Sequence, residues 1–162
     1  MDQQRLNQQL ILWVRLLLGL QYLLGGINWW YKILPFPSIT DPVASANKHA
    51  VLMAMIETGW MFQTAKLIEL LTGLALLFNR FIPLMLVVSF PVALSTFILD
   101  AMIGPTLVGF LGGTTSFAVL WAKFLDLVYF GGCVLAMQGF LMIAYFDRYR
   151  PMLVARAEAK AP

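Results

Sequence analysis

Residues 61–99 read MFQTAKLIELLTGLALLFNRFIPLMLVVSFPVALSTFIL, two apolar runs separated by a short turn that contains Arg80. A helix that crosses the hydrocarbon core of a bilayer needs about 20 mostly apolar residues. We therefore expect an antiparallel pair of membrane-spanning helices over residues 61–78 and 82–99. Glu69 lies inside the first run, where an ionisable group costs roughly 2.5–3.5 kcal/mol to insert. This carboxylate is the first candidate for a functional residue.

The composition of the whole chain also indicates a membrane protein. The 162 residues are 60% hydrophobic and only 12% charged, whereas about 25% of the residues in an ordinary soluble domain are charged. Two further apolar runs, at residues 10–31 and 124–146, are long enough to cross a bilayer. The sequence thus predicts one all-α membrane domain over residues 1–162, a bundle of four transmembrane helices whose first span is not a cleaved signal peptide.

The connections before the second span and after the third are long. Asp41 as N-cap and Pro42 at the first helical position predict a short amphipathic helix over residues 43–58, lying on or near the membrane surface. Residues 101–123 are apolar but contain four glycines. We expect a Gly-rich interfacial or partly re-entrant loop there, with a fifth span as the alternative.

Lysine and arginine near the span ends set the orientation, because they favour the cytoplasmic side. One side collects Arg5, Arg80, Arg148, Arg150, Arg156 and Lys160. The opposite side carries Lys32, Lys48 and Lys123. We therefore expect both termini, including the tail at 147–162, in the cytoplasm, and the 43–58 helix outside it. Asp100 is expected to cap the third span, and Lys123 to pair with Asp126.

Six polar side chains inside the predicted spans form the candidate ligand site: Glu69, Lys66, Arg15, Gln21, Tyr22 and Gln138. At 1.5 Å per residue, Arg15 lies about 8 Å and Glu69 about 15 Å from the cytoplasmic ends of their spans. Lys66 is therefore the better partner for Glu69, since residues three apart share a helix face. Arg15 can instead extend to the membrane interface.

The same rise per residue places four of these residues, together with Ser89 and Pro91, at one level near the middle of the membrane. The four are Gln21, Tyr22, Glu69 and Gln138. Pro91 also frees a backbone carbonyl one turn earlier. This layer can either form a pocket for a head group, a quinone or a proton, or supply interhelical hydrogen bonds worth about 0.6 kcal/mol each. For the neutral side chains we favour the hydrogen bonds, whereas both interpretations stay open for Glu69.

Small and aromatic residues have a structural interpretation. Gly19 and Gly26 share a face of the first span, and Gly73 lies one turn after Glu69, so they would let helices approach closely. An aromatic belt is expected at the outer span ends, formed by Trp29, Trp30, Tyr31, Trp60 and Trp121.

Several kinds of chemistry are excluded by the residue counts. The single cysteine, Cys133, rules out an internal disulfide or a cysteine zinc cluster, and the single histidine, His49, rules out a haem ligand pair. We recognise no Ser-His-Asp set and no phosphate-binding glycine loop. We expect no catalytic residues, no metal site and no cofactor of the chain's own, although a quinone or lipid could bind. The net charge of +3 gives no reason to expect a nucleic-acid partner.

The chain resembles the DoxX family of small bacterial membrane proteins. The matching segments are RLLLG at 15–19, GINW at 26–29, PFP at 35–37, TGW at 58–60, KLIELLTGLALL at 66–77, NRFIPL at 79–84 and FPV at 90–92. The resemblance implies a four-helix bundle in the bacterial inner membrane. Some relatives are named for association with quinol oxidase or thiosulfate:quinone oxidoreductase.

Three functions follow as hypotheses. The first is an accessory subunit, not itself an enzyme, that packs against a larger and quinone-linked membrane complex. The second is a quinone- or lipid-binding protein that uses the polar residues around Glu69. The third is a membrane assembly or trafficking factor whose outer loops contact partners.

Overall fold

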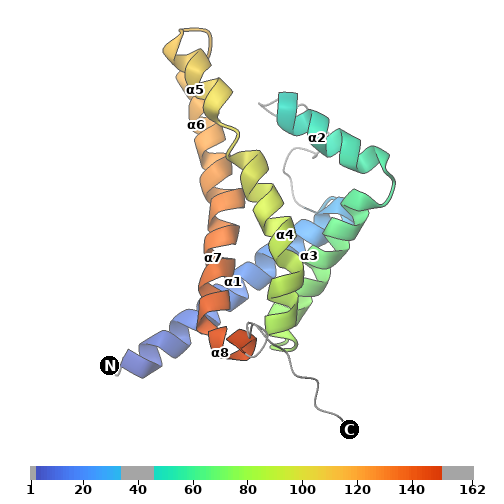
Figure 1. Ribbon diagram of the computed structural model, residues 1–162, viewed down its shortest axis with the longest axis vertical. Coiled ribbons are helices and arrows are strands. Elements are labelled where there is room, and N and C mark those ends of the chain that lie inside the picture. The colour runs from blue at the N-terminus through green and yellow to red at the C-terminus, as the bar shows by residue number, and fades with distance from the viewer. Residues whose placement is uncertain (1–2, 34–45, 151–162) are drawn as a thin grey trace.

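The computed structural model describes residues 3–33 and 46–150, and these residues form helices joined by turns (Figure 1). The helices are α1 (Gln3–Tyr31), α2 (Ala46–Glu57), α3 (Met61–Leu77), α4 (Ile82–Asp100), α5 (Gly104–Leu111), α6 (Phe117–Asp126), the π-helical segment η1 (Leu127–Gly132), α7 (Cys133–Ala144) and α8 (Phe146–Tyr149). The start of α1 and helix α8 lie toward one end of the molecule, called here the α8 end, and α5 and α6 form the opposite, hairpin end.

Three helical segments are long and apolar enough to cross a membrane: Gln3–Tyr31, Ile82–Leu111 and Phe117–Ala144. They contain most of the predicted spans 10–31, 82–99 and 124–146. The predicted span 61–78 corresponds to α3, whose 17 residues measure about 25 Å. Helix α3 is long and apolar enough for a fourth candidate span only when it is taken together with α2, and the two helices are bent by 96° relative to each other. The expectation of an all-helical chain is confirmed for the described residues, and three to four of their helical segments are long and apolar enough to span a membrane.

The predicted Gly-rich loop at 101–123 is instead mostly helical. Helices α5 and α6 form a hairpin that continues α4 and η1 past the rest of the molecule (Figure 1). The glycines act at its tip: Gly113 has a φ of +72°, and a Cβ at Gly109 would lie 2.4 Å from Oγ1 of Thr115. Glycine therefore marks a tight helix–helix turn here, because Gly113 adopts a positive φ and Gly109 has no room for a side chain.

Helix α2 lies where the amphipathic helix at 43–58 is predicted, although residues 43–45, Asp41 and Pro42 lie outside the described part of the chain. A corner joins it to α3. At this corner the Thr58 hydroxyl donates to the carbonyl of Met55 at 2.6 Å and accepts from the backbone N–H of Met61 at 3.1 Å. Gly59 follows with a φ of +78°, a conformation that favours glycine. The corner sets the steep angle between α2 and α3.

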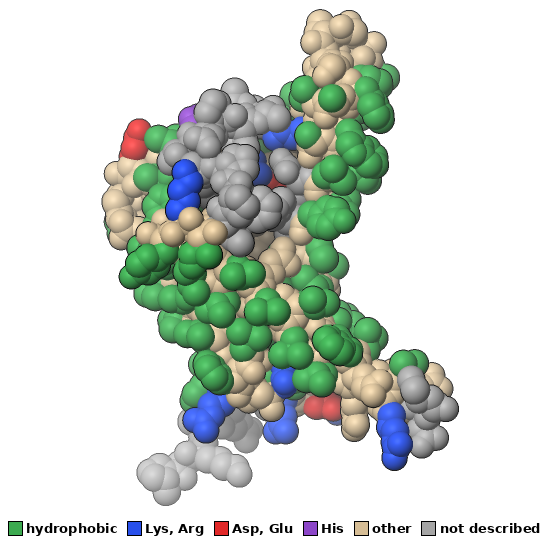
Figure 2. Space-filling model, turned by 180° about the vertical axis from the view of Figure 1, so that it is seen from behind, with side chains coloured by type: hydrophobic (Ala, Val, Ile, Leu, Met, Phe, Trp, Pro, Cys, Tyr) green, Lys and Arg blue, Asp and Glu red, His purple; other side chains and the backbone are tan. Residues whose placement is uncertain are grey.

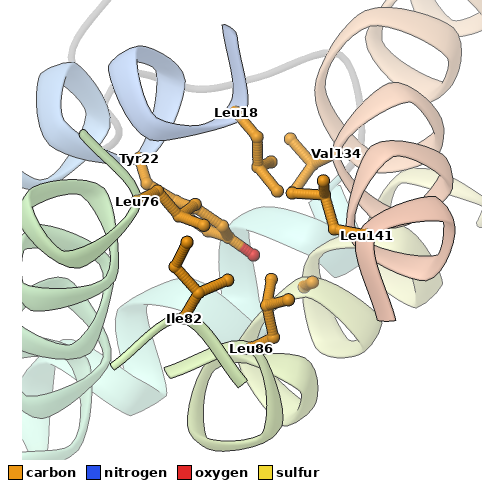
Figure 3. Close-up of a cluster of buried hydrophobic side chains, with 8 residues drawn as sticks. Leu18, Tyr22, Leu76, Ile82, Leu86, Val134 and Leu141 are labelled. Atoms are coloured by element: carbon orange, nitrogen blue, oxygen red, sulfur yellow. The ribbon is translucent and has the colours of Figure 1, made fainter. Parts of the chain in front are cut away.

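Helices α1 and α3 form the most extensive helix pair. A Cβ at Gly73 would lie 2.5 Å from the backbone nitrogen of Leu23, and one at Gly26 would lie 3.0 Å from that of Leu70. The predicted close approach through glycines is therefore confirmed. Next to the contact between α1 and α3, called here the seam, helices α1, α3, α4 and α7 enclose the apolar core (Figure 3). The core consists of Leu18, Tyr22, Leu76, Ile82, Leu86, Ala93, Val134 and Leu141.

Candidate functional site

The residues predicted to form one ligand site are distributed over separate places in the bundle. The first place is a hydrogen-bonded group in the interior, the second is an ion pair at the seam between α1 and α3, and the third is a contact at the turn between α3 and α4.

The interior polar group consists of Tyr22, Ser89 and Gln138. Gln138 is fully buried, and its amide donates to the carbonyl of Leu86 at 2.7 Å and to the hydroxyl of Ser89 at 3.0 Å. Its side-chain oxygen accepts the Tyr22 hydroxyl, which points into the core in Figure 3. Both amide hydrogens and the amide oxygen thus have partners within the protein. The group links α1, α4 and α7, as the hydrogen-bond interpretation of the neutral residues predicts.

Pro91 frees a carbonyl that the interior polar group does not use. It lies inside α4 and frees the carbonyl of Val87, four residues earlier, from its helical donor. The carbonyl that Gln138 uses is that of Leu86. The interior hydrogen bond to α4 therefore uses a different carbonyl from the one that the proline frees.

Gln21 lies outside the interior group. Its side-chain amide donates to the backbone carbonyl of Tyr129 at 3.3 Å, in η1. A π-helical segment shifts the regular i to i−4 hydrogen-bond pattern, so backbone groups along it become available to a neighbouring helix. Gln21 thus connects α1 to the π-helical segment between α6 and α7.

The Lys66–Glu69 pair is the partnership that the sequence predicts, and it is confirmed. Nζ of Lys66 lies 2.7 Å from Oε2 of Glu69, and the two side chains are 15% and 12% exposed. The same Nζ lies 5.5 Å from the ring centre of Phe62, which packs edge-on against Trp29 at 4.7 Å. The carboxylate faces α1, because a Cβ at Gly25 would lie 3.3 Å from its oxygen. Pairing lowers the cost of holding both charges in a partly buried seam.

Arg15 lies apart from Glu69, as the depth estimate predicts. Its guanidinium donates to the side-chain oxygen of Asn79, in the turn between α3 and α4. At the same end of the bundle, the hydroxyl of Tyr149 in α8 donates to the carbonyl of Pro83 at 3.1 Å, and burial raises the pKa of this phenol. These contacts hold α1 and α8 to the α3–α4 turn.

A buried ion pair that the sequence did not reveal joins α2 to the end of α4. Nζ of Lys48 binds the carboxylate of Asp100, whose side chain is fully buried. A Cβ at Gly131 would lie 2.9 Å from Oδ2 of Asp100, so η1 covers the carboxylate. Asp100 therefore holds α2. The predicted helix cap is wrong, because the C-cap residue of α4 is Ala101. The sequence places Lys48 and Asp100 on the same predicted side of the membrane. The two residues are 52 positions apart, so no local pattern indicates that they pair.

Two further predictions concern the pair of Lys123 and Asp126 and the aromatic belt. Lys123 is 2% exposed, whereas the side chain of its predicted partner Asp126 lies outside the described ones. The aromatic residues expected in an outer belt include exposed Trp30, Trp60 and Trp121. Their exposure fits contact with lipid or with another protein.

None of the six predicted residues lines either of two surface pockets. One, the α3–α4 groove, has a volume of about 780 Å³ and is lined by Leu71, Leu74, Ala75, Phe78, Arg80, Phe81, Leu84 and Met85. The other, the α8 hollow, is lined by Asn79, Phe81, Ile82, Pro83, Tyr145 and Arg148. Both adjoin the turn between α3 and α4. Within the described ranges, no group of three His, Cys, Asp or Glu side chains is placed to hold a metal ion.

Comparison of the chain with protein-family models, with curated proteins and with solved structures gives no match.

Proposed function

We propose that this chain is a DoxX-like inner-membrane protein that serves as an accessory subunit of a larger membrane complex. The observation that carries the proposal is the apolar hairpin of α5 and α6, which extends past the bundle with most of its apolar side chains exposed. The complex is proposed to be quinone-linked, as the family resemblance implies.

The level of the hairpin follows from the charges that bracket α4. Arg80 precedes this helix and Asp100 ends it, and its 19 residues rise about 28 Å, close to the thickness of the hydrocarbon core. Helix α5 continues in the same helical unit for a further eight residues, about 12 Å. The tip of the hairpin then lies beyond the apolar part of the bilayer, where lipid tails cannot cover it.

The surface of the hairpin suits a protein partner. No charged residue lies between Asp100 and Lys123, and the side chains of Val108, Leu111 and Phe117 are 63–77% exposed. Successive ring contacts at 6.2, 6.3 and 5.6 Å form an aromatic row of Phe110, Phe117, Trp121 and Phe124. Contiguous apolar patches mark interaction sites, and aromatic side chains supply much of the binding energy at such sites.

The positive charges give the proposed orientation. The described arginines outside the helix interior, Arg5, Arg80, Arg148 and Arg150, belong to the chain start, the α3–α4 turn and α8. Blue side chains lie along the α8 end in Figure 2, and others lie in the half of the molecule nearer the hairpin. Under the positive-inside rule this end faces the cytoplasm, with both termini, and the hairpin faces outward.

The proposal is tested with two lysine substitutions at equally exposed positions. Leu111 in the hairpin is 77% exposed and Ile143 near the α8 end is 76% exposed. We expect L111K to abolish migration of the tagged chain with a larger complex on native gels, because a charge is introduced into the contact surface. The I143K control keeps that migration. Both variants keep the thermal stability of the purified chain, since neither side chain is buried. A wild-type chain that migrates alone, or an L111K chain that still migrates with the complex, contradicts the proposal.

The other two functions are distinguished by separate outcomes. A quinone- or lipid-binding role for Glu69 requires that Glu69→Gln weaken ligand binding while the complex stays intact. We expect no such loss, because the carboxylate is bonded to Lys66 at the helix seam. An assembly factor would contact its complex only during biogenesis, so the tagged chain would leave the native-gel complex when protein synthesis is blocked.

A further inference from the structure

The α3–α4 groove combines a long apolar wall with one cationic side chain. Seven of its eight lining residues are apolar and the eighth is Arg80. Leu71 lies about two turns of α3 away from the turn, so the groove runs along the helices from Arg80 toward the middle of the membrane. Its volume of about 780 Å³ lies within the range of small-molecule sites.

The shape of the groove follows from the local backbone. Asn79 and Phe81 both adopt left-handed conformations, with φ of 57° and 55°. Between them, the N–H of Arg80 donates to the carbonyl of Ala75 at 2.9 Å. Phe78 and Phe81 are 73% and 74% exposed and flank the mouth of the groove. The small side chain of Ala75 leaves space between them.

A second arginine lies in the adjoining hollow. Arg148 lines the α8 hollow, which shares Phe81 with the groove. Within residues 3–33 and 46–150, no carboxylate oxygen lies within 4.0 Å of a side-chain nitrogen of Arg80 or Arg148. Arginine forms two parallel hydrogen bonds with phosphate, and basic pockets at the cytoplasmic ends of membrane helices suit anionic head groups.

We propose that the α3–α4 groove binds an anionic phospholipid, with one acyl chain along the apolar wall and the phosphate on Arg80. Arg148 adds positive charge on the other side of Phe81. The position suits a lipid of the inner leaflet in the orientation proposed above, which places Arg80 and the α3–α4 turn at the cytoplasmic end of the bundle. The site is separate from the hairpin surface, so it does not depend on the accessory-subunit proposal.

Native mass spectrometry of the full chain in detergent tests the site. The probes are phosphatidylglycerol and phosphatidylcholine with identical acyl chains, added together. We expect wild-type protein to retain phosphatidylglycerol about fivefold better, the preference that one arginine near the head groups gives. Arg80→Gln removes this preference, whereas Arg5→Gln, which removes an exposed arginine at the start of α1, leaves it unchanged.

A second variant tests the apolar wall. Ala75→Phe fills the groove and is expected to lower retention of both lipids while Arg80 is still present. The control Leu67→Phe enlarges an exposed side chain of α3 outside the groove lining and keeps retention normal. Equal retention of the two lipids by wild type overturns the proposal, as does an Arg80→Gln chain that behaves like Arg5→Gln. The exposed position of Arg80 ensures that this variant folds even where Ala75→Phe does not.

Discussion

The bundle of α1, α3, α4 and α7 and the hairpin of α5 and α6 are both apolar, but they use apolar residues in opposite ways. In the bundle, side chains such as Leu18 and Leu86 are fully buried, and Gln138 has all its hydrogen bonds inside the protein. In the hairpin, α5 buries none of its residues. The bundle therefore has a buried interior of its own, whereas α5 has none and leaves its apolar surface for something else to cover.

The largest effect is expected where the bundle is tightest. Gly73→Ala places a methyl group 2.5 Å from the backbone nitrogen of Leu23, so we expect a loss of about 2 kcal/mol in the free energy of unfolding, in the range for overpacking. Gly139→Ala is the matched control, because a Cβ there has no neighbour within 4 Å. It should keep or raise stability, since alanine favours helix more than glycine. Detergent-unfolding curves followed by circular dichroism measure both, and equal stabilities would mean that the α1–α3 seam is looser than described.

A smaller loss is expected from the interior polar group. Gln138→Leu keeps the side-chain volume similar but leaves the Tyr22 hydroxyl without its acceptor and Ser89 without its donor. We expect a loss of about 1–2 kcal/mol in the same assay. Gln63→Leu on the exposed face of α3 is the control and should change stability little. A Gln138→Leu chain as stable as wild type would show that these hydrogen bonds do not hold the helices together.

The smallest effect on stability is expected from the seam ion pair. A double-mutant cycle of Lys66→Gln and Glu69→Gln should give a coupling of about 0.5–1 kcal/mol, because both side chains are partly exposed and the pair lies on one helix. High salt should reduce this coupling where water reaches the pair. A coupling of several kcal/mol would instead indicate a deeply buried pair and would reopen a functional role for Glu69.

Local features of the bundle could be predicted from the sequence. The lengths of the apolar runs predicted the three helical segments that are long and apolar enough to cross a bilayer, because crossing is a requirement on length and composition. The Lys66–Glu69 pair was predictable because helix geometry alone brings residues three apart together. The close approach at Gly73 follows from the same reasoning, since small residues on one face favour helix contact.

Features that depend on the arrangement of helices could not be predicted. The pair of Lys48 and Asp100 forms because α2 turns back over the end of α4, and no local pattern specifies that direction. The hairpin was missed because glycines are typical of loops, whereas Gly109 and Gly113 here close a turn between two helices. Arg15 contacts Asn79, 64 positions away, for the same reason. The division of the candidate site into separate contacts is thus a property of the tertiary structure.

The most direct test of the central claim is site-specific photo-cross-linking from intact membranes. A photoreactive amino acid replaces Val108 in the hairpin, which is 70% exposed, or Leu84 on the bundle surface, which is 57% exposed. The account predicts that position 108 cross-links to one larger membrane protein, whereas position 84 cross-links to lipid. If position 108 also captures only lipid, or only a second copy of this chain, the hairpin is not the contact surface of an accessory subunit.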